Sequence, residues 1–351
     1  MTSRSATRNA ICLCVDSRMM IPAMFVAKSV LSTSRPGRNP FDLFIFAEEA
    51  EVTDDQREWM RANDVGLRTD IDLSDYHGLF NPEHRLSAAT LTRLFLPSIL
   101  EETHDRVLYL DADLTIHGDV SRIFSLDLGD HAFAAVRSAT IFPKGEKQKA
   151  ETEAHFDDLG MTKPYRYFNS GVMLIDIPIW RNRQVSENAM EFIRTSFDKC
   201  RLMDEDALNA TVDGDFCGMS PLWNMSPTRT PEEYRRTGSY MPVILHHMGM
   251  AKPWRLFIRH RHMRIGWYYY GLYRDFLKDT PWRDWLATNW TWGDFTRNLE
   301  WELVESLRKF TRRAERRGQA EIRERYWREE PFADLEQGIV VRDGGVMRLA
   351  D

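Results

Sequence analysis

Residues 106–113 have the sequence RVLYLDAD, from Arg106 to Asp113. An uninterrupted apolar run is typical of a strand buried between both layers of an α/β sheet. This run ends in two carboxylates one residue apart, and side chains at i and i+2 of an extended chain point to the same side. Ligands of open α/β sheets collect at the carboxyl ends of the strands. We therefore expect Asp111 and Asp113 to hold a divalent metal that neutralises a diphosphate.

Strand and helix patterns alternate around this stretch. Helix 53–63 begins at a cap formed by Thr53 or Asp54, and helix 87–100 is expected to be interrupted near Pro97. This rhythm predicts a mostly parallel, doubly wound sheet flanked by helices. The expected strands are 10–15, 41–47, 65–71, 107–110, 131–136, 171–177 and 243–247, and the expected helices are 21–31, 53–63, 87–100, 186–197 and 204–212.

The character of the chain changes after Trp254. Residues 255–273 combine arginine, histidine and aromatic residues, and 295–330 form a long helical pattern rich in arginine and glutamate. Residues 338–349 indicate a small hairpin turning at 343–345. We expect a catalytic domain over residues 1–254, a helical extension over 255–330 and a tail over 331–351.

The composition is that of a globular protein. Of 351 residues, 43% are hydrophobic and 28% charged, and the net charge of −6 argues against a nucleic-acid-binding protein. The polar N-terminus lacks a signal-peptide core, and the longest uncharged apolar run, 19–27, is too short to span a bilayer, so we expect a cytoplasmic protein. Cys12, Cys14, Cys200 and Cys217 lack metal-ligand spacing; Cys12 and Cys14 are expected to be small buried hydrophobes.

An Asp-x-Asp pair alone is weak evidence for a metal site, because the chain contains four, at 70–72, 111–113, 204–206 and 213–215. The pair at 111–113 is accompanied by three further motifs: YFNSGVMLID at 167–176, DEDALN at 204–209 and HHMGMAKPW at 246–254. In this order the four elements resemble glycosyltransferase family 8, whose members are retaining nucleotide-sugar transferases with a GT-A fold. The resemblance extends from about residue 10 to residue 254.

The resemblance implies a metal centre and a nucleotide site. Asp111, Asp113 and His246 match the metal ligands of the family; His246 is favoured over His247, whose side chain faces the opposite way on a strand. Hard carboxylate oxygens with one imidazole suit Mn²⁺, with Mg²⁺ as the alternative. The metal would bridge the phosphates of a UDP-sugar. Further donor contacts are implied for Asp16, Arg93, Ala112, Gly249 and Lys252.

The same resemblance places Glu205, Asp206, Asn169 and Lys252 at the reacting centre. Asp206 matches a carboxylate that bonds sugar hydroxyls, and Asn169 is a neighbouring polar contact. Glu205 replaces a glutamine that is common in the family, so it would either stabilise or attack the anomeric carbon. We favour same-face attack by the acceptor. Trp254 is expected to pack rather than to bind substrate. Two departures, Ser17-Arg18 after Asp16 and Ser138 in place of an aspartate, leave the base contacts and the donor sugar open.

The sequence thus predicts a metal-dependent retaining glycosyltransferase that moves a hexose from a UDP-sugar to a glycan or glycolipid acceptor of the cell surface. A sugar-nucleotide-forming nucleotidyltransferase is the alternative, although residues 16–20 lack its glycine-rich loop; an inactive UDP-sugar-binding relative is another. Residues 255–273 are expected either to contact a membrane surface, at its inner face, or to pack on the catalytic domain. The charged helix after Phe295 is a solvated face or a dimer contact, and the oligomeric state is left open.

Overall fold

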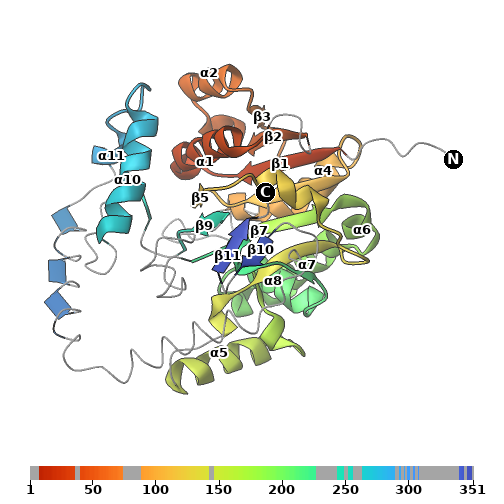
Figure 1. Ribbon diagram of the computed structural model, residues 1–351. Helices are drawn as coiled ribbons and strands as arrows, with labels where there is room; N and C mark the ends of the chain where they lie inside the picture. The colour runs from red at the N-terminus through yellow and green to blue at the C-terminus, as the bar shows by residue number, and fades with distance from the viewer. Residues whose placement is uncertain are drawn as a thin grey trace.

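The structure is a computed structural model (Figure 1). It describes residues 8–35, 40–73, 88–141, 146–226, 243–248, 252–255 and 263–288, together with helical positions between 292 and 307 and the strands 340–343 and 346–349. Gly249 lies outside the described residues, as does the helical pattern predicted beyond position 307.

A seven-stranded mixed sheet forms the centre of the fold, in the order β3-β2-β1-β4-β7-β6-β8. All neighbouring strands are parallel except at β7, which runs antiparallel to both β4 and β6. The predicted mostly parallel sheet is therefore confirmed. Its strands are β1 (Asn9–Cys14), β2 (Phe41–Phe46), β3 (Gly66–Arg68), β4 (Arg106–Leu110), β6 (Phe133–Arg137), β7 (Phe168–Asp176) and β8 (Cys217–Gly218).

Helices cover both faces of the sheet, and alternate side chains of each strand pack on opposite layers (Figure 1). On β4, Leu108 and Leu110 face one layer, whereas Val107 and Tyr109 face the other. One layer holds α1 (Met20–Thr33), α2 (Asp54–Ala62), α10 (Met263–Leu277) and α11 (Trp285–Thr288); the other holds α4 (Thr92–Leu100), α6 (Ile177–Asn182), α7 (Val185–Ser196) and α8 (Asp204–Val212). Helix α5 (Glu146–Asp158) packs through a smaller apolar cluster with Tyr167.

Local sequence signals explain several boundaries. Thr53 caps α2 in a capping box with Gln56, as one of the two predicted caps. Cys12 and Cys14 are buried as expected. The prediction of an interruption near Pro97 is wrong: α4 runs without a break to Leu100. Proline removes one backbone hydrogen bond, but the buried face of α4 holds the helix in place against the sheet.

A second, two-stranded ribbon joins distant parts of the chain. Strand β5 (Leu114–Ile116) follows the Asp111–Asp113 segment and pairs antiparallel with β9 (Ile244–His246), so that Leu114 is opposite His246. This register brings the histidine next to the aspartates. A third pair, β10 (Val340–Asp343) and β11 (Val346–Leu349), is antiparallel, which confirms the strands of the predicted hairpin.

The extension packs on the catalytic domain through its aromatic residues. Tyr273 of α10 stacks on Phe25 of α1, with ring centroids 3.9 Å apart, and Phe276 contacts Phe25 and Trp59. Buried Trp254 contacts Tyr273, so it packs as expected. Among the helices in the described part of the chain, none is both long and apolar enough to cross a membrane.

Candidate functional site

Asp111, Asp113 and His246 converge at the carboxyl end of β4. One ligand atom from each lies within 4.8 Å of the others, and Nε2 of His246 is 3.2 Å from Oδ1 of Asp113 and 3.6 Å from Oδ2 of Asp111. The convergence differs in origin from the prediction, because residues 111–113 form a bend between β4 and β5 rather than an extended strand. Two carboxylates and one imidazole are a donor set that fits a hard or borderline divalent cation.

Gly171 of β7 leaves the room that this cluster occupies. A Cβ at this position would lie 2.5 Å from Oδ2 of Asp111 and 3.0 Å from Nδ1 of His246. The backbone also contributes, since the Asp111 amide donates to the carbonyl of Gly171 over 2.8 Å. A side chain on residue 171 would therefore push the aspartate and the histidine apart.

The two adjacent histidines face opposite ways. His246 points to the aspartates, whereas His247 turns its Nε2 to Oγ1 of Thr115 at 2.8 Å. On its other side His246 donates from Nδ1 to Oδ1 of Asn224, also at 2.8 Å. This bond leaves Nε2 directed at the aspartates, which is the orientation that a metal ligand requires.

Lys252 forms an ion pair with Asp113 and donates to the carbonyl oxygen of His247 over 3.1 Å. Burial opposes ionisation of Asp113, but His246 and Lys252 hold the pKa of its carboxyl well below the usual range. The pKa of His246 is raised, because Asp113 and Asp111 outweigh the effect of burial. Asp113 is therefore ionised, which is the form in which a carboxylate binds a cation.

Arg93 lies beneath the cluster rather than on a helix surface. Its guanidinium is 3.1 Å from Asp204 and 3.2 Å from Asp111, and it lies over the ring of Tyr109. It also donates to Oγ of Ser170 over 2.9 Å. Burial raises the pKa of Asp204 to about 6, although Arg93 opposes the change. Arg93 thus joins the end of β4 to the start of α8.

Glu205 is held in a fixed position by β7. Its Oε2 accepts from Nδ2 of Asn169 over 2.7 Å and from the backbone amide of Ser170 over 3.0 Å. Burial raises the pKa of Glu205 to about 7, and the Ser170 amide acts in the opposite direction. A carboxyl group with a pKa near neutrality is a candidate for proton transfer or for electrostatic work in a reacting centre.

Asp206 is fully buried, and protein donors occupy both of its oxygens. Tyr167 and His155 bond Oδ1 at 2.7 and 3.0 Å, and the amides of Arg201 and Leu202 bond Oδ2 at 2.6 and 2.7 Å. These bonds hold the loop that enters α8 through Met203, whose φ of 44° is unusual for a residue other than glycine. These four donors leave no lone pair of Asp206 for the expected contact with sugar hydroxyls.

The predicted nucleoside contact Asp16 caps the 3-10 helix Ser17–Met19. Its carboxylate accepts from the amides of Arg18 and Met19 and forms an ion pair with the Arg18 side chain at 2.6 Å. Ala112 is buried between the two aspartates. Ser138 bonds Thr140 over 2.9 Å. Ser170, Gly171 and Asp204 lie within the sequence motifs but were given no role there, and Asn224 lies outside the motifs.

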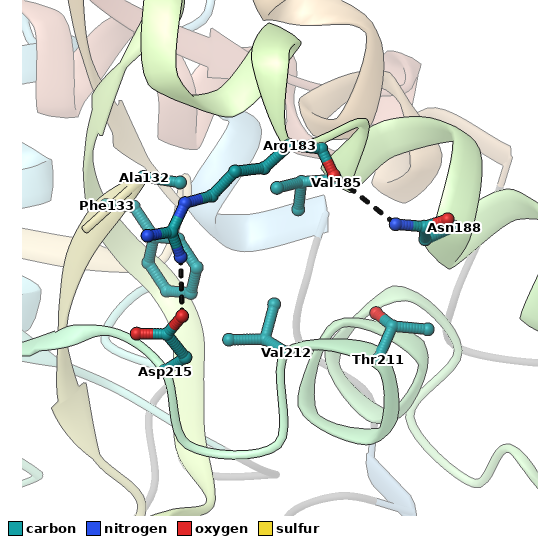
Figure 2. Close-up of a pocket in the computed structure, with 8 residues that line it drawn as sticks. All are labelled: Ala132, Phe133, Arg183, Val185, Asn188, Thr211, Val212 and Asp215. Carbon is teal, nitrogen blue, oxygen red and sulfur yellow. Dashed lines mark hydrogen bonds and ion pairs between the residues drawn. The ribbon is translucent and has the colours of Figure 1, made fainter. Parts of the chain in front are cut away.

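A separate cavity of about 150 Å³ lies at the other end of the strands (Figure 2). Phe133 begins β6, which runs parallel to β4, whereas Asp111 follows the end of β4. Arg183 reaches Asp215 across this cavity, as Figure 2 shows. It is lined by Ala132, Phe133, Arg183, Val185, Asn188, Thr211, Val212 and Asp215, and none of the metal-site residues belongs to it.

Residues 10–256 match the model of glycosyl transferase family 8. The chain belongs to this family. It is 28% identical over 205 residues to general stress protein A of Bacillus subtilis (54% of this chain and 67% of that protein). It is 25% identical over 205 residues to the lipopolysaccharide 1,2-glucosyltransferase of Escherichia coli (56% of each chain), so it spans little more than half the length of that enzyme.

The fold of this family 8 chain is similar to that of the galactosyltransferase LgtC, solved with donor and acceptor sugar analogues. The two share 24% identity with a TM-score of 0.61, over 78% of this chain and 99% of LgtC. The GT-A fold predicted from the motifs is thereby confirmed.

Proposed function

We propose that this family 8 glycosyltransferase moves a hexose from a UDP-sugar to a glycan acceptor, with a divalent cation, Mn²⁺ in preference to Mg²⁺, held by Asp111, Asp113 and His246. One observation carries the proposal: these ligands, Lys252, Arg93 and Glu205 surround the carboxyl end of one strand. Cell-surface polysaccharide or lipooligosaccharide is the acceptor class, by analogy with the lipopolysaccharide glucosyltransferase.

The residues fit the cation. With its Nδ1 proton bonded to Asn224, the neutral imidazole of His246 would present the lone pair of Nε2 to the cation, and the carboxylate of Asp113 is ionised. When bound, the cation would neutralise negative charge on the diphosphate leaving group. Lys252 supplies a second positive charge; it would exchange part of its contact with Asp113 for a phosphate oxygen.

We assign Glu205 and Asn169 to the reacting centre, as the family resemblance implies. Glu205 is only 7% exposed and holds its position through Asn169 and Ser170. Its carboxylate form would stabilise positive charge at an oxocarbenium-like anomeric carbon. We favour this electrostatic role over covalent attack, because Oε2 is already engaged by three donors: Nδ2 of Asn169 and the amide and hydroxyl of Ser170. In this route the acceptor hydroxyl attacks the anomeric carbon from the same face that the diphosphate leaves. An oxygen of the departing diphosphate takes the proton of that hydroxyl.

The test is hydrolysis of a panel of UDP- and GDP-sugars with Mn²⁺, with Mg²⁺ or with EDTA. We expect release of UDP from one sugar in the presence of Mn²⁺, and its loss in Asp113→Ala. Asp198→Asn changes an exposed carboxylate and is the control. Metal-dependent binding of UDP without turnover by the wild type, with or without acceptor glycans, would favour the inactive relative. Release of pyrophosphate from a nucleoside triphosphate and a sugar phosphate would favour the nucleotidyltransferase.

The extension contributes less to a membrane contact than its composition suggests. Tyr269 and Tyr273 pack inward, against His247 and Phe25, whereas Tyr268 is 52% exposed. Among the described residues of 255–273, the proposed contact with an anionic membrane surface is therefore assigned to exposed ones such as Tyr268. Co-sedimentation with phosphatidylglycerol vesicles tests it, with phosphatidylcholine vesicles as the control; equal binding to both would contradict it.

A further inference from the structure

A continuous chain of side-chain hydrogen bonds joins the metal cluster to Glu205. Nδ1 of His246 donates to Oδ1 of Asn224 at 2.8 Å, and Nδ2 of Asn224 donates to Oδ1 of Asn169 at 2.8 Å. Nδ2 of Asn169 in turn donates to Oε2 of Glu205 at 2.7 Å. Four separate elements supply these residues: β9, the end of the 3-10 helix Pro221–Trp223, β7 and α8.

Asn224 is the centre of this chain and is 3% exposed. Its backbone is fixed on the C-terminal side, because the amide of Met225 donates to the carbonyl of Ile244 at 3.0 Å and the amide of His246 donates to the carbonyl of Met225 at 2.8 Å. Residue 224 therefore cannot shift without moving the ligand itself.

The amide side chain of Asn224 satisfies both neighbours. Residue 224 must accept a hydrogen bond from His246 and donate one to Asn169. Oδ1 of Asn169 also accepts a hydrogen bond from the amide of Gly171 at 3.2 Å. A carboxylate accepts but does not donate, and an aliphatic group does neither. Each residue in the chain therefore donates to the next, from the imidazole of His246 to the carboxylate of Glu205.

We propose that Asn224 is a positioning residue with two separable tasks: it aims Nε2 of His246 at the metal, and through Asn169 it fixes the carboxylate of Glu205. The inference rests on the proposed function, since it assumes that the cluster binds a cation and that Glu205 faces the sugar. It adds that the two sites are mechanically coupled through one buried amide.

Two substitutions separate the tasks. Asn224→Ala removes both contacts, and loss of such a partner of a ligating histidine weakens metal binding about 10- to 100-fold. Asn224→Asp keeps an acceptor for His246, so the Mn²⁺ dissociation constant stays within about threefold of wild type. It loses the donor to Asn169, so kcat falls about tenfold or more while KM for the donor changes little.

The experiment measures Mn²⁺ binding by electron paramagnetic resonance without donor, and kcat and KM for UDP-sugar hydrolysis. A third readout needs no metal: the exchange-protected Nδ1 proton of His246, observed by NMR, is expected in wild type and Asn224→Asp and absent in Asn224→Ala. Asn188→Asp, an exposed change beside the cavity of Figure 2, is the control, and thermal unfolding confirms that every variant is folded.

Mn²⁺ binding by Asn224→Ala within about threefold of wild type would overturn the first task. Wild-type kcat in Asn224→Asp would overturn the second. Failure of the wild type to bind Mn²⁺ would instead overturn the proposed function, and the Nδ1 proton would still decide whether Asn224 orients His246.

Discussion

Arg93 and Asp204 form a buried ion pair, with 3.1 Å between the guanidinium Nε and Oδ2 of the carboxylate. Their side chains are 6% and 4% exposed, and the same guanidinium lies 3.2 Å from Asp111. The pair therefore ties the segment that carries the metal ligands to the N-terminus of α8, which carries Glu205. Helix α4 acts as the support for both halves of the site.

Loss of Arg93 should destabilise the fold as well as the site. Arg93→Met leaves the buried carboxylate of Asp204 and the half-buried carboxylate of Asp111 without their cation, and breaking a buried pair costs about 3–5 kcal/mol. The double variant with Asp204→Asn should recover part of this loss, because one uncompensated charge is removed. Urea unfolding of the wild type, both single variants and the double variant measures the coupling. Strictly additive effects of the two substitutions would contradict the buried pair.

Gly171→Ala should weaken metal binding. The added Cβ would lie within 3.0 Å of Nδ1 of His246 and closer still to Asp111, so the two ligands must separate. We expect the Mn²⁺ dissociation constant to rise about tenfold or more, the scale seen when ligand orientation is disturbed. Gly271→Ala on α10 is the matched control, because nothing lies within 4 Å of its added Cβ. Unchanged Mn²⁺ affinity in Gly171→Ala would show that the cluster does not bind the metal as arranged here.

Glu205 should make stability depend on pH. Its pKa is about 7 in the folded protein, against an ordinary value of 4.5 for a glutamate in water. Between these values the folded form keeps the proton that the unfolded form releases, so the free energy of unfolding falls as pH rises. The difference corresponds to about 3 kcal/mol, present below pH 4.5 and lost above about pH 7.

Glu205→Gln should remove this dependence, because a neutral amide resembles the protonated acid. We expect the variant to be more stable than wild type at pH 8, by up to about 3 kcal/mol, and similar to it at pH 4.5. Urea unfolding between these pH values is the measurement, with the exposed Glu191→Gln as the control. Parallel pH profiles for wild type and Glu205→Gln would show that folding does not raise the pKa of Glu205.

The sequence predicted the elements that carry the site and the choice between the two histidines. Apolar runs ending in polar residues locate strand ends, so Asp111, Asp113 and His246 were found from pattern and motif. Two of the groups that position them, Asn224 and Gly171, were not found, because they act only through contacts between separate elements. Arg93 was expected as a donor contact, but not as the cation that joins Asp111 to Asp204. The antiparallel direction of β7 could not be predicted either, since the hydrophobic pattern of a strand does not show which way it runs in the sheet.

Asp206 is the opposite case: the sequence assigned it a role that its packing does not support. A family carboxylate was assigned to the sugar, yet its oxygens are filled by Tyr167, His155 and the amides of the 201–202 loop. Sequence spacing places Asp206 one residue from Glu205. On a helix, neighbouring side chains point about 100° apart, so one faces the site and the other the core.

Asp206→Asn should therefore act on stability first. The amide of asparagine has the size of the carboxylate, but its NH2 group would face N–H or O–H donors that now bond a carboxylate oxygen. We expect this loss of hydrogen bonds to cost about 2–4 kcal/mol in the free energy of unfolding. Asp198→Asn, an exposed change close to the same loop, should stay within about 0.5 kcal/mol of wild type. Urea unfolding measures both variants, and donor KM is compared below their unfolding transitions. Wild-type stability in Asp206→Asn together with a raised KM would restore the direct sugar contact, because a residue that binds substrate changes affinity without loosening the fold.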